Sequence, residues 1–182
     1  WKAIKTKKYI ALMGSRGIGK SYIFACIAMW FYTLYEKKHI IISSTNEQTT
    51  DEAWDKIRDT LRSTESRHRA LRHKRLKDSL KEIYSGEEIY TDDGKDERGF
   101  LSKLEKVIYG HNAGVTRGSR PDFQHVEEFA AFPSEPSPGS LFRCIAQSKG
   151  SWKIMGSILK AFVAFTGTGG SVNNEDAERI FM

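Results

Sequence analysis

The sequence predicts an α/β domain built on a mostly parallel central sheet that helices cover on both faces. Short apolar runs typical of strands alternate with longer runs typical of helices, and the connections between them have ordinary lengths. The run 39–43 is continuously apolar at its centre, as expected of a strand buried on both faces. The chain has 182 residues, 39% hydrophobic and 29% charged, which is enough for one substantial core.

The first predicted strand, residues 9–13, leads into a glycine-rich segment with the pattern G-x-x-x-x-G-K-S. The apolar run 22–35 predicts a helix directly after it, which is the context of a phosphate-binding loop. Glycines let backbone N–H groups face an anion, and the helix adds its positive end. A glycine turn that only caps a helix is the alternative. The predicted nucleotide-binding residues are Gly14, Ser15, Arg16, Gly17, Ile18, Gly19, Lys20, Ser21 and Tyr22.

A second strand, 39–43, is predicted to precede a helix over 47–61, with Thr45 or Asn46 as its cap and an apolar face of Ala53, Ile57 and Leu61. The following stretch, 63–80, is strongly basic, and Leu76, Leu80 and Ile83 recur at helical spacing. Two interpretations remain open for this stretch: a solvated helix face, or a surface that follows a DNA backbone by charge.

Later elements are predicted from shorter signals. Residues 85–99 form a turn-rich loop or hairpin whose acidic side chains are solvated. Strands are predicted over 101–109, 123–126 and 158–165, a polar loop over 112–122, and helices over 141–147 and from Asn173 or Asn174 to Phe181. Cys26 and Cys144 both lie in apolar runs, which favours small buried side chains and no zinc site.

Two adjacent acids, Glu127 and Glu128, end the predicted strand 123–126. One carboxylate at such a strand tip can hold the Mg²⁺ shell opposite the Ser21 hydroxyl, and a second can deprotonate the attacking water. Neighbouring strand residues point to opposite sides, so both roles require the strand to end between the two acids. An ordinary acidic helix start is the alternative. Gln124 and His125 predict an edge-exposed or irregular strand.

Three ordered motifs resemble the large terminase subunit of tailed bacteriophages. The phosphate loop has an arginine, Arg16, at its third position; the run 116–133 leads from an arginine-glycine loop into the acidic strand end and a Phe-Pro segment; and 165–170 contains Thr-Gly-Thr-Gly-Gly. The phosphate loop is shared with many ATPases, but the ordered set is more specific. The resemblance covers residues 9 to about 182.

The resemblance implies a P-loop NTPase fold of the additional-strand type and an ATPase that drives double-stranded DNA into a prohead, with ATP and Mg²⁺ as cofactors. Glu127 falls on the metal-shell acid, where the family usually has Asp, and Glu128 on the catalytic glutamate. Arg16 falls on an arginine that senses the γ-phosphate, and Arg117 or Arg120 on one that acts on a neighbouring subunit. The coupling motif falls on Thr166, Gly167, Thr168 and Gly169.

The resemblance also implies partners and a place of action. These are DNA, the small terminase subunit, the portal or prohead, and a ring of identical subunits, with a monomer in isolation as the alternative. No membrane is implied, and the place of action is the host cytoplasm. We expect residues 1–182 to form a single ATPase domain excised from a longer protein with a C-terminal nuclease. The rival functions are a helicase-like translocase and a weakly hydrolysing nucleotide-binding assembly module.

Overall fold

The computed structural model describes residues 9–149, 154–155, 158–159 and 161–168. Its centre is a seven-stranded sheet with the order β1-β11-β8-β2-β7-β4-β3. The first five strands in this order pair in parallel, and β4 and β3 add an antiparallel edge. The strands are β1 (Tyr9–Gly14), β2 (His39–Ser44), β3 (Arg75–Asp78), β4 (Glu82–Ser85), β7 (Lys103–Ile108), β8 (Phe123–Val126) and β11 (Phe162–Thr168).

The position of β11 confirms the predicted fold class. This strand lies between β1, which leads into the glycine-rich loop, and β8, which leads into the acidic pair. An extra strand between these two is the feature that defines the additional-strand type. The carboxyl ends of parallel strands meet at one edge of a sheet, where open α/β folds place their ligands.

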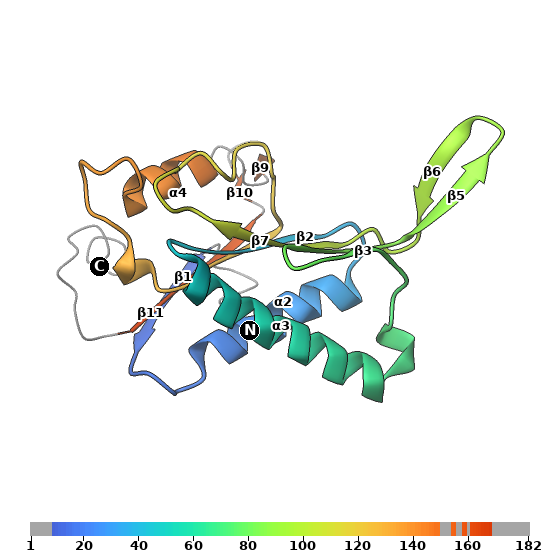
Figure 1. Cartoon of the computed structure of the whole chain (residues 1–182), viewed down its shortest axis with the longest axis horizontal. Helices are drawn as coiled ribbons and strands as arrows, with labels where there is room; N and C mark the ends of the chain where they lie inside the picture. The colour runs from blue at the N-terminus through green and yellow to red at the C-terminus, as the bar shows by residue number, and fades with distance from the viewer. Residues whose placement is uncertain (1–8, 150–153, 156–157, 160, 169–182) are drawn as a thin grey trace.

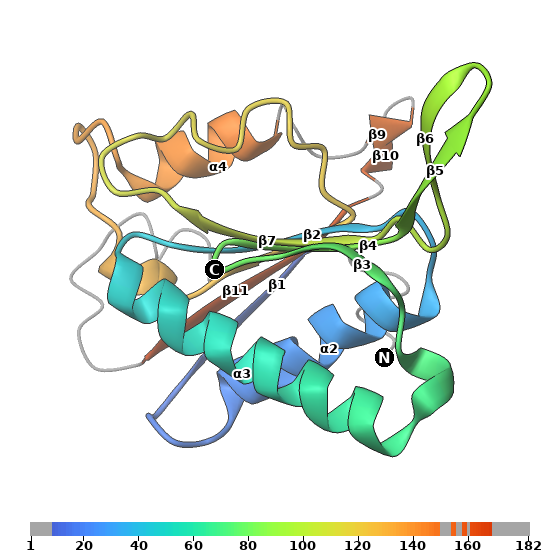
Figure 2. The ribbon, with the colours of Figure 1, turned by 45° about the vertical axis from the view of Figure 1, so that its right-hand side comes forward.

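Helices cover both faces of the sheet, as predicted. Figures 1 and 2 show α2 (Lys20–Leu34) and α3 (Glu47–Arg67) together on one face and α4 (Leu141–Lys149) on the other. Each face has its own buried cluster, one against α2 and α3 and one against α4 and the short turn η2 (Phe129–Ala131). The helices thereby bury both faces of the sheet and leave its carboxyl edge open.

Helix α3 begins where predicted and continues past Leu61 to Arg67. The Asn46 side chain accepts a hydrogen bond from the backbone N–H of Thr49 at 2.8 Å, which confirms the predicted cap. Trp54, Ile57 and Leu61 are buried on one face of the helix. The added turns are polar and lack buried residues, so hydrophobic periodicity could not reveal them.

The prediction of helical structure around Leu76, Leu80 and Ile83 is wrong. Strands β3 and β4 form an antiparallel pair at the sheet edge, and Leu80 lies in the turn between them, 79% exposed. Only Ile83 of the three is fully buried. Several of the basic residues here pair with acids: Arg75 contacts Glu65 and Asp78, and Lys74 contacts Glu87. The spacing of four was therefore a coincidence of two short strands and a turn.

Strand β8 also differs from its prediction, because it is central and not at an edge. It lies between β11 and β2, and Gln124 and His125 are both buried. The polar atoms are accommodated by hydrogen bonds: the Gln124 amide donates to the Tyr109 hydroxyl at 2.8 Å, and His125 Nε2 lies 2.8 Å from the Thr166 hydroxyl. Polar residues in a strand therefore marked a buried network and not an exposed edge.

The acidic stretch forms a hairpin, as predicted, of β5 (Glu87–Thr91) and β6 (Gly94–Arg98), which projects beyond the sheet in Figures 1 and 2. The last strand differs from the predicted 158–165: a small antiparallel pair, β9 (Ile154–Met155) and β10 (Ile158–Leu159), precedes β11. Cys144 is buried, but Cys26 is exposed. The helix predicted near Asn173 lies outside the described residues, and among these no helix is long and apolar enough to span a membrane.

Candidate functional site

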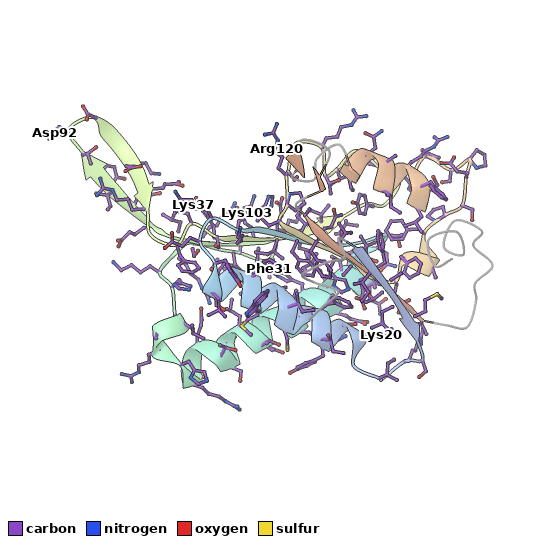
Figure 3. All side chains as sticks on the ribbon, turned by 180° about the vertical axis from the view of Figure 1, so that it is seen from behind. Lys20, Phe31, Lys37, Asp92, Lys103 and Arg120 are labelled. Atoms are coloured by element: carbon purple, nitrogen blue, oxygen red, sulfur yellow. The ribbon has the colours of Figure 1, made fainter. Side chains whose placement is uncertain are left out.

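A cleft of about 750 Å³ opens at the carboxyl edge of the sheet. In Figure 3, Lys20 marks this end of the molecule, and Asp92 marks the tip of the hairpin at the opposite end. The segments that border the cleft are the glycine-rich loop, the first turns of α2 and α3, the end of β11 and the acidic pair. The lining residues are Arg16, Gly17, Gly19, Lys20, Ser21, Tyr22, Asn46, Gln48, Thr49, Glu52, Lys56, Glu127, Glu128, Ala131 and Thr168.

The glycine-rich loop has the conformation that its glycines were predicted to allow. Gly17 and Gly19 have φ values of 82° and 84°, in the left-handed region that other L-residues adopt with strain. Gly19 is the N-cap of α2, so the helix begins at Lys20. The Lys20 ammonium donates to the carbonyl oxygens of Gly14 and Ser15 at 2.8 and 2.9 Å, so it lies over the loop. A positive charge, a helix N-terminus and exposed loop backbone therefore share one wall of the cleft.

Ser21 and Glu127 meet across the cleft. The Ser21 hydroxyl donates to Glu127 Oε1 at 2.5 Å, although the two residues are 106 positions apart in the sequence. Glu127 Oε2 accepts from the Thr166 hydroxyl at 2.6 Å and lies 2.9 Å from His125 Nε2. Burial alone would raise the pKa of Glu127, but its interactions with His125, Ser21 and Thr166 outweigh burial and lower this pKa to about 2. Glu127 is therefore a buried carboxylate that stays ionised at neutral pH.

Glu128 turns away from Glu127 because the strand ends before the pair. Strand β8 stops at Val126, and Glu128 has a left-handed backbone with φ 48° and ψ 50°. Its carboxylate accepts from the backbone N–H of Thr168 at 3.0 Å and from the Thr168 hydroxyl at 2.5 Å. The condition set by the sequence, that the two acids can differ in role only if the strand ends there, is met. A strained non-glycine backbone of this kind is frequent at functional sites.

The first turns of α3 supply cleft residues that were not predicted from the sequence: Asn46, Gln48, Thr49, Glu52 and Lys56. Strand β2 runs parallel to β8, so the helix that follows it must begin at the same edge of the sheet as the glycine-rich loop. The polar residues at the start of that helix were therefore a usable signal, but the parallel pairing had to be assumed in order to use it.

The three predicted arginines occupy different places. Arg16 lines the cleft, while Arg117 and Arg120 belong to the loop between β7 and β8 and do not line it. Arg117 Nε donates to the Gln147 side chain on α4 at 2.6 Å. Arg120 lies just before β8, near the amino edge of the sheet, and Figure 3 shows it well away from Lys20. Neither Arg117 nor Arg120 therefore reaches the cleft of its own chain.

The predicted coupling residues form the end of β11. Thr166 contacts Glu127, Thr168 contacts Glu128, and Gly167 between them packs against the Phe129 ring, which a Cβ at 167 would approach to 3.1 Å. Each acid therefore has a threonine partner on the neighbouring strand. Gly169 lies outside the described residues.

Comparison with protein families gives one match. The family described as terminase large subunit, T4likevirus-type, N-terminal, matches residues 11–149, which is more than half of the chain. A search of curated protein sequences gave no match.

Solved structures with a similar fold are large terminases of bacteriophages. The large terminase ATPase domain of Thermus phage P74-26 superposes with a TM-score of 0.59 at 11% identity over 91% of this chain and 61% of that one. The large terminase of another thermophilic bacteriophage, in complex with ADP, gives 0.57 at 13% identity over 90% and 34%. The large terminase of bacteriophage HK97 gives 0.56 at 10% identity over 88% and 29%. The chain thus spans less than two thirds of the length of these structures.

Proposed function

The chain belongs to the T4likevirus-type N-terminal family of terminase large subunits, and from this premise we propose that it is an ATPase motor domain. It hydrolyses ATP and thereby moves double-stranded DNA into a viral prohead. The observation that carries the proposal is the contact of Ser21 with Glu127, in a cleft that Lys20 and Glu128 also line. Phosphate-binding and acidic groups from distant parts of the chain converge there, as hydrolysis of a nucleotide requires.

The phosphate side of the site is Lys20 and the loop backbone from Gly14 to Gly19. A buried ammonium and inward-facing N–H groups stabilise the charge of a triphosphate. Arg16 stands on the same loop, where its guanidinium can reach the γ-phosphate. The ADP complex of the second thermophilic phage terminase is consistent with this assignment, since the folds are alike.

Magnesium fits the oxygen donors opposite the loop. The Ser21 hydroxyl and the Glu127 carboxylate are hard oxygen ligands of the kind that Mg²⁺ prefers, and their contact at 2.5 Å places them at one point. When bound, the ion would neutralise charge on the phosphate oxygens. Ser21 and Glu127 would hold it, and the low pKa of Glu127 keeps that carboxylate ionised at neutral pH.

Glu128 is the proposed general base. It lines the cleft beside Glu127, and its left-handed backbone directs its carboxylate to a different partner, Thr168. It thus accepts a proton from the attacking water while Glu127 stays with the metal. A positioned carboxylate base contributes on the order of 10²–10⁴ to the rate.

A neighbouring subunit would complete the site. Arg117 and Arg120 lie outside the cleft of their own chain, so either can act only on the nucleotide of another copy. A trans-acting arginine stabilises transition-state charge and contributes roughly 10³–10⁵ to the rate. This arrangement requires a ring of subunits during packaging. Further partners are the small terminase subunit and the portal or prohead, in the host cytoplasm, and residues 1–182 act as a single ATPase domain within a larger protein.

The test is the variant Glu128→Gln, which removes the base and keeps the shape of the side chain. We expect it to bind ATP with wild-type affinity and to lose at least about a hundredfold in turnover. A matched control is Glu88→Gln, on the hairpin far from the cleft, which should behave like wild type. Normal hydrolysis by Glu128→Gln would remove Glu128 as the base, and failure of the wild-type chain to bind ATP would remove the proposal itself.

A weakly hydrolysing assembly module is the second candidate, because both oxygens of Glu128 are engaged by Thr168. A turnover assay with and without duplex DNA, at concentrations that allow subunits to associate, separates the two. Turnover that stays below about one per hour in every condition, far under the usual range of enzymes, would favour the module over the motor.

A further inference from the structure

Glu127 receives hydrogen-bonding groups on both oxygens, and the two oxygens have different partners. Oε1 faces Ser21 alone among the described contacts, at 2.5 Å. Oε2 faces two residues of the sheet, with the Thr166 hydroxyl at 2.6 Å and His125 Nε2 at 2.9 Å. His125 and Thr166 also contact each other at 2.8 Å, so the three groups form a closed triangle. One oxygen is thus committed to the protein interior, and the other is directed at the cleft.

The two interior partners come from neighbouring central strands and are rigidly placed. His125 precedes Glu127 by two residues, which puts both side chains on the same face of the sheet, and Thr166 belongs to the adjacent strand β11. The exposed fractions of His125 and Thr166 are 1% and 0%. The His125 ring also packs on Phe24 of α2, with ring centroids 4.9 Å apart. Neither partner can therefore move without disturbing the core.

The length of Glu127 gives this triangle a purpose. A glutamate has one more rotatable bond than an aspartate, so more side-chain conformations must be excluded before its carboxylate occupies a single position. Anchoring Oε2 excludes them, since the carboxylate can then present only Oε1 beside Ser21. A shorter aspartate would lack the reach to contact Thr166 and Ser21 at the same time. The histidine and the glutamate are thus matched features of this chain.

We propose that His125 and Thr166 are positioning residues that fix the Glu127 carboxylate, so that its free oxygen and the Ser21 hydroxyl together form a Mg²⁺ site. Neither residue contacts the ion; both act through Glu127. This inference rests on the proposed function, because it concerns the metal that accompanies the nucleotide. Outer partners of this kind change metal affinity by about 10–100-fold when they are removed from metal sites.

The experiment measures how binding of a fluorescent ADP analogue depends on Mg²⁺, so that no turnover is required. Thr166→Val removes the hydroxyl and keeps the shape, and Thr166→Ser keeps the hydroxyl. We expect Thr166→Val to raise the Mg²⁺ concentration for half-maximal binding by roughly tenfold. Thr166→Ser should stay within about twofold of wild type, and His125→Leu should behave like Thr166→Val, with partial rescue in His125→Gln.

A double-variant comparison separates positioning from loss of stability. Glu127→Asp alone should also raise the Mg²⁺ requirement, and adding Thr166→Val to it should cost little more, because the shorter side chain no longer uses the triangle. Fully additive effects, or an unchanged Mg²⁺ requirement in Thr166→Val, would overturn the proposal. If His125→Leu does not fold, the Thr166→Val and Thr166→Ser pair still decides. Absence of Mg²⁺-dependent binding in the wild-type chain would instead contradict the proposed function.

Discussion

Thr168 holds the carboxylate of Glu128 with two hydrogen bonds, one from its backbone N–H at 3.0 Å and one from its hydroxyl at 2.5 Å. The two residues lie 40 positions apart, at the ends of adjacent parallel strands. The contact links the proposed base directly to the segment predicted to couple hydrolysis with movement. Any shift of the end of β11 must therefore alter the direction in which Glu128 points.

The first prediction concerns this contact. Thr168→Val removes the hydroxyl donor and keeps the backbone donor, so Glu128 loses part of its orientation. We expect kcat to fall by roughly tenfold with KM within about twofold, because the base is misplaced while nucleotide binding is retained. Steady-state ATPase kinetics test this, with Thr168→Ser as the variant that should recover kcat. A change in KM alone would show that Thr168 acts on binding.

The second prediction concerns the buried hydroxyl of Tyr109. It accepts from the Gln124 amide at 2.8 Å and contacts the Ser148 hydroxyl at 2.5 Å, so it joins β8 to α4. Tyr109→Phe removes one partner from each, and we expect the free energy of unfolding to fall by about 1–3 kcal/mol in urea titrations. Tyr84→Phe is the control: its hydroxyl contacts Glu97 on the hairpin, and its removal should cost less than about 0.5 kcal/mol. Equal effects would show that the buried network adds no stability.

The third prediction concerns pH. The pKa of Glu105 is lowered from 4.5 by hydrogen bonding to His39 and by the charge of Lys103, against the effect of burial. A carboxylate with a lower pKa in the folded state contributes stability above its unfolded pKa and loses it as pH falls through the folded pKa. The wild-type chain should thus lose more stability than Glu105→Gln between about pH 6 and pH 3. Urea unfolding of both chains across this window measures the difference, and parallel pH profiles would contradict it.

The fourth prediction concerns the hairpin. No side chain of residues 87–98 is buried, and the backbones of Gly86 and Gly99 lie next to each other, since a Cβ on Gly99 would be 3.6 Å from the Gly86 Cα. Joining these two glycines directly should remove the hairpin and leave the fold intact. We expect nucleotide affinity within about twofold of wild type and a stability change of about 1 kcal/mol or less. Loss of folding, measured by circular dichroism, would show that the hairpin supports the sheet edge.

Sequence reasoning succeeded where the relevant interactions are local. The glycine-rich loop lies between its own strand and helix, so a single segment of the chain contains the strand, the turn and the helix cap that define it. The Asn46 cap is local in the same sense, since its partner is three residues away. The basic stretch near Leu76 failed for the opposite reason: its strands exist because β7 offers an edge to pair with, and pairing is a long-range interaction.

The acidic pair shows the same division within a single site. The sequence by itself determined that a phosphate loop and two glutamates were present, because residue type and spacing carry that chemistry. Only the tertiary structure decided which oxygen of Glu127 faces Ser21, and that His125 and Thr166 hold the other. The reason is physical: these contacts join strands and a helix that are distant in the chain, and hydrogen bonds across a sheet depend on a register that no local pattern specifies.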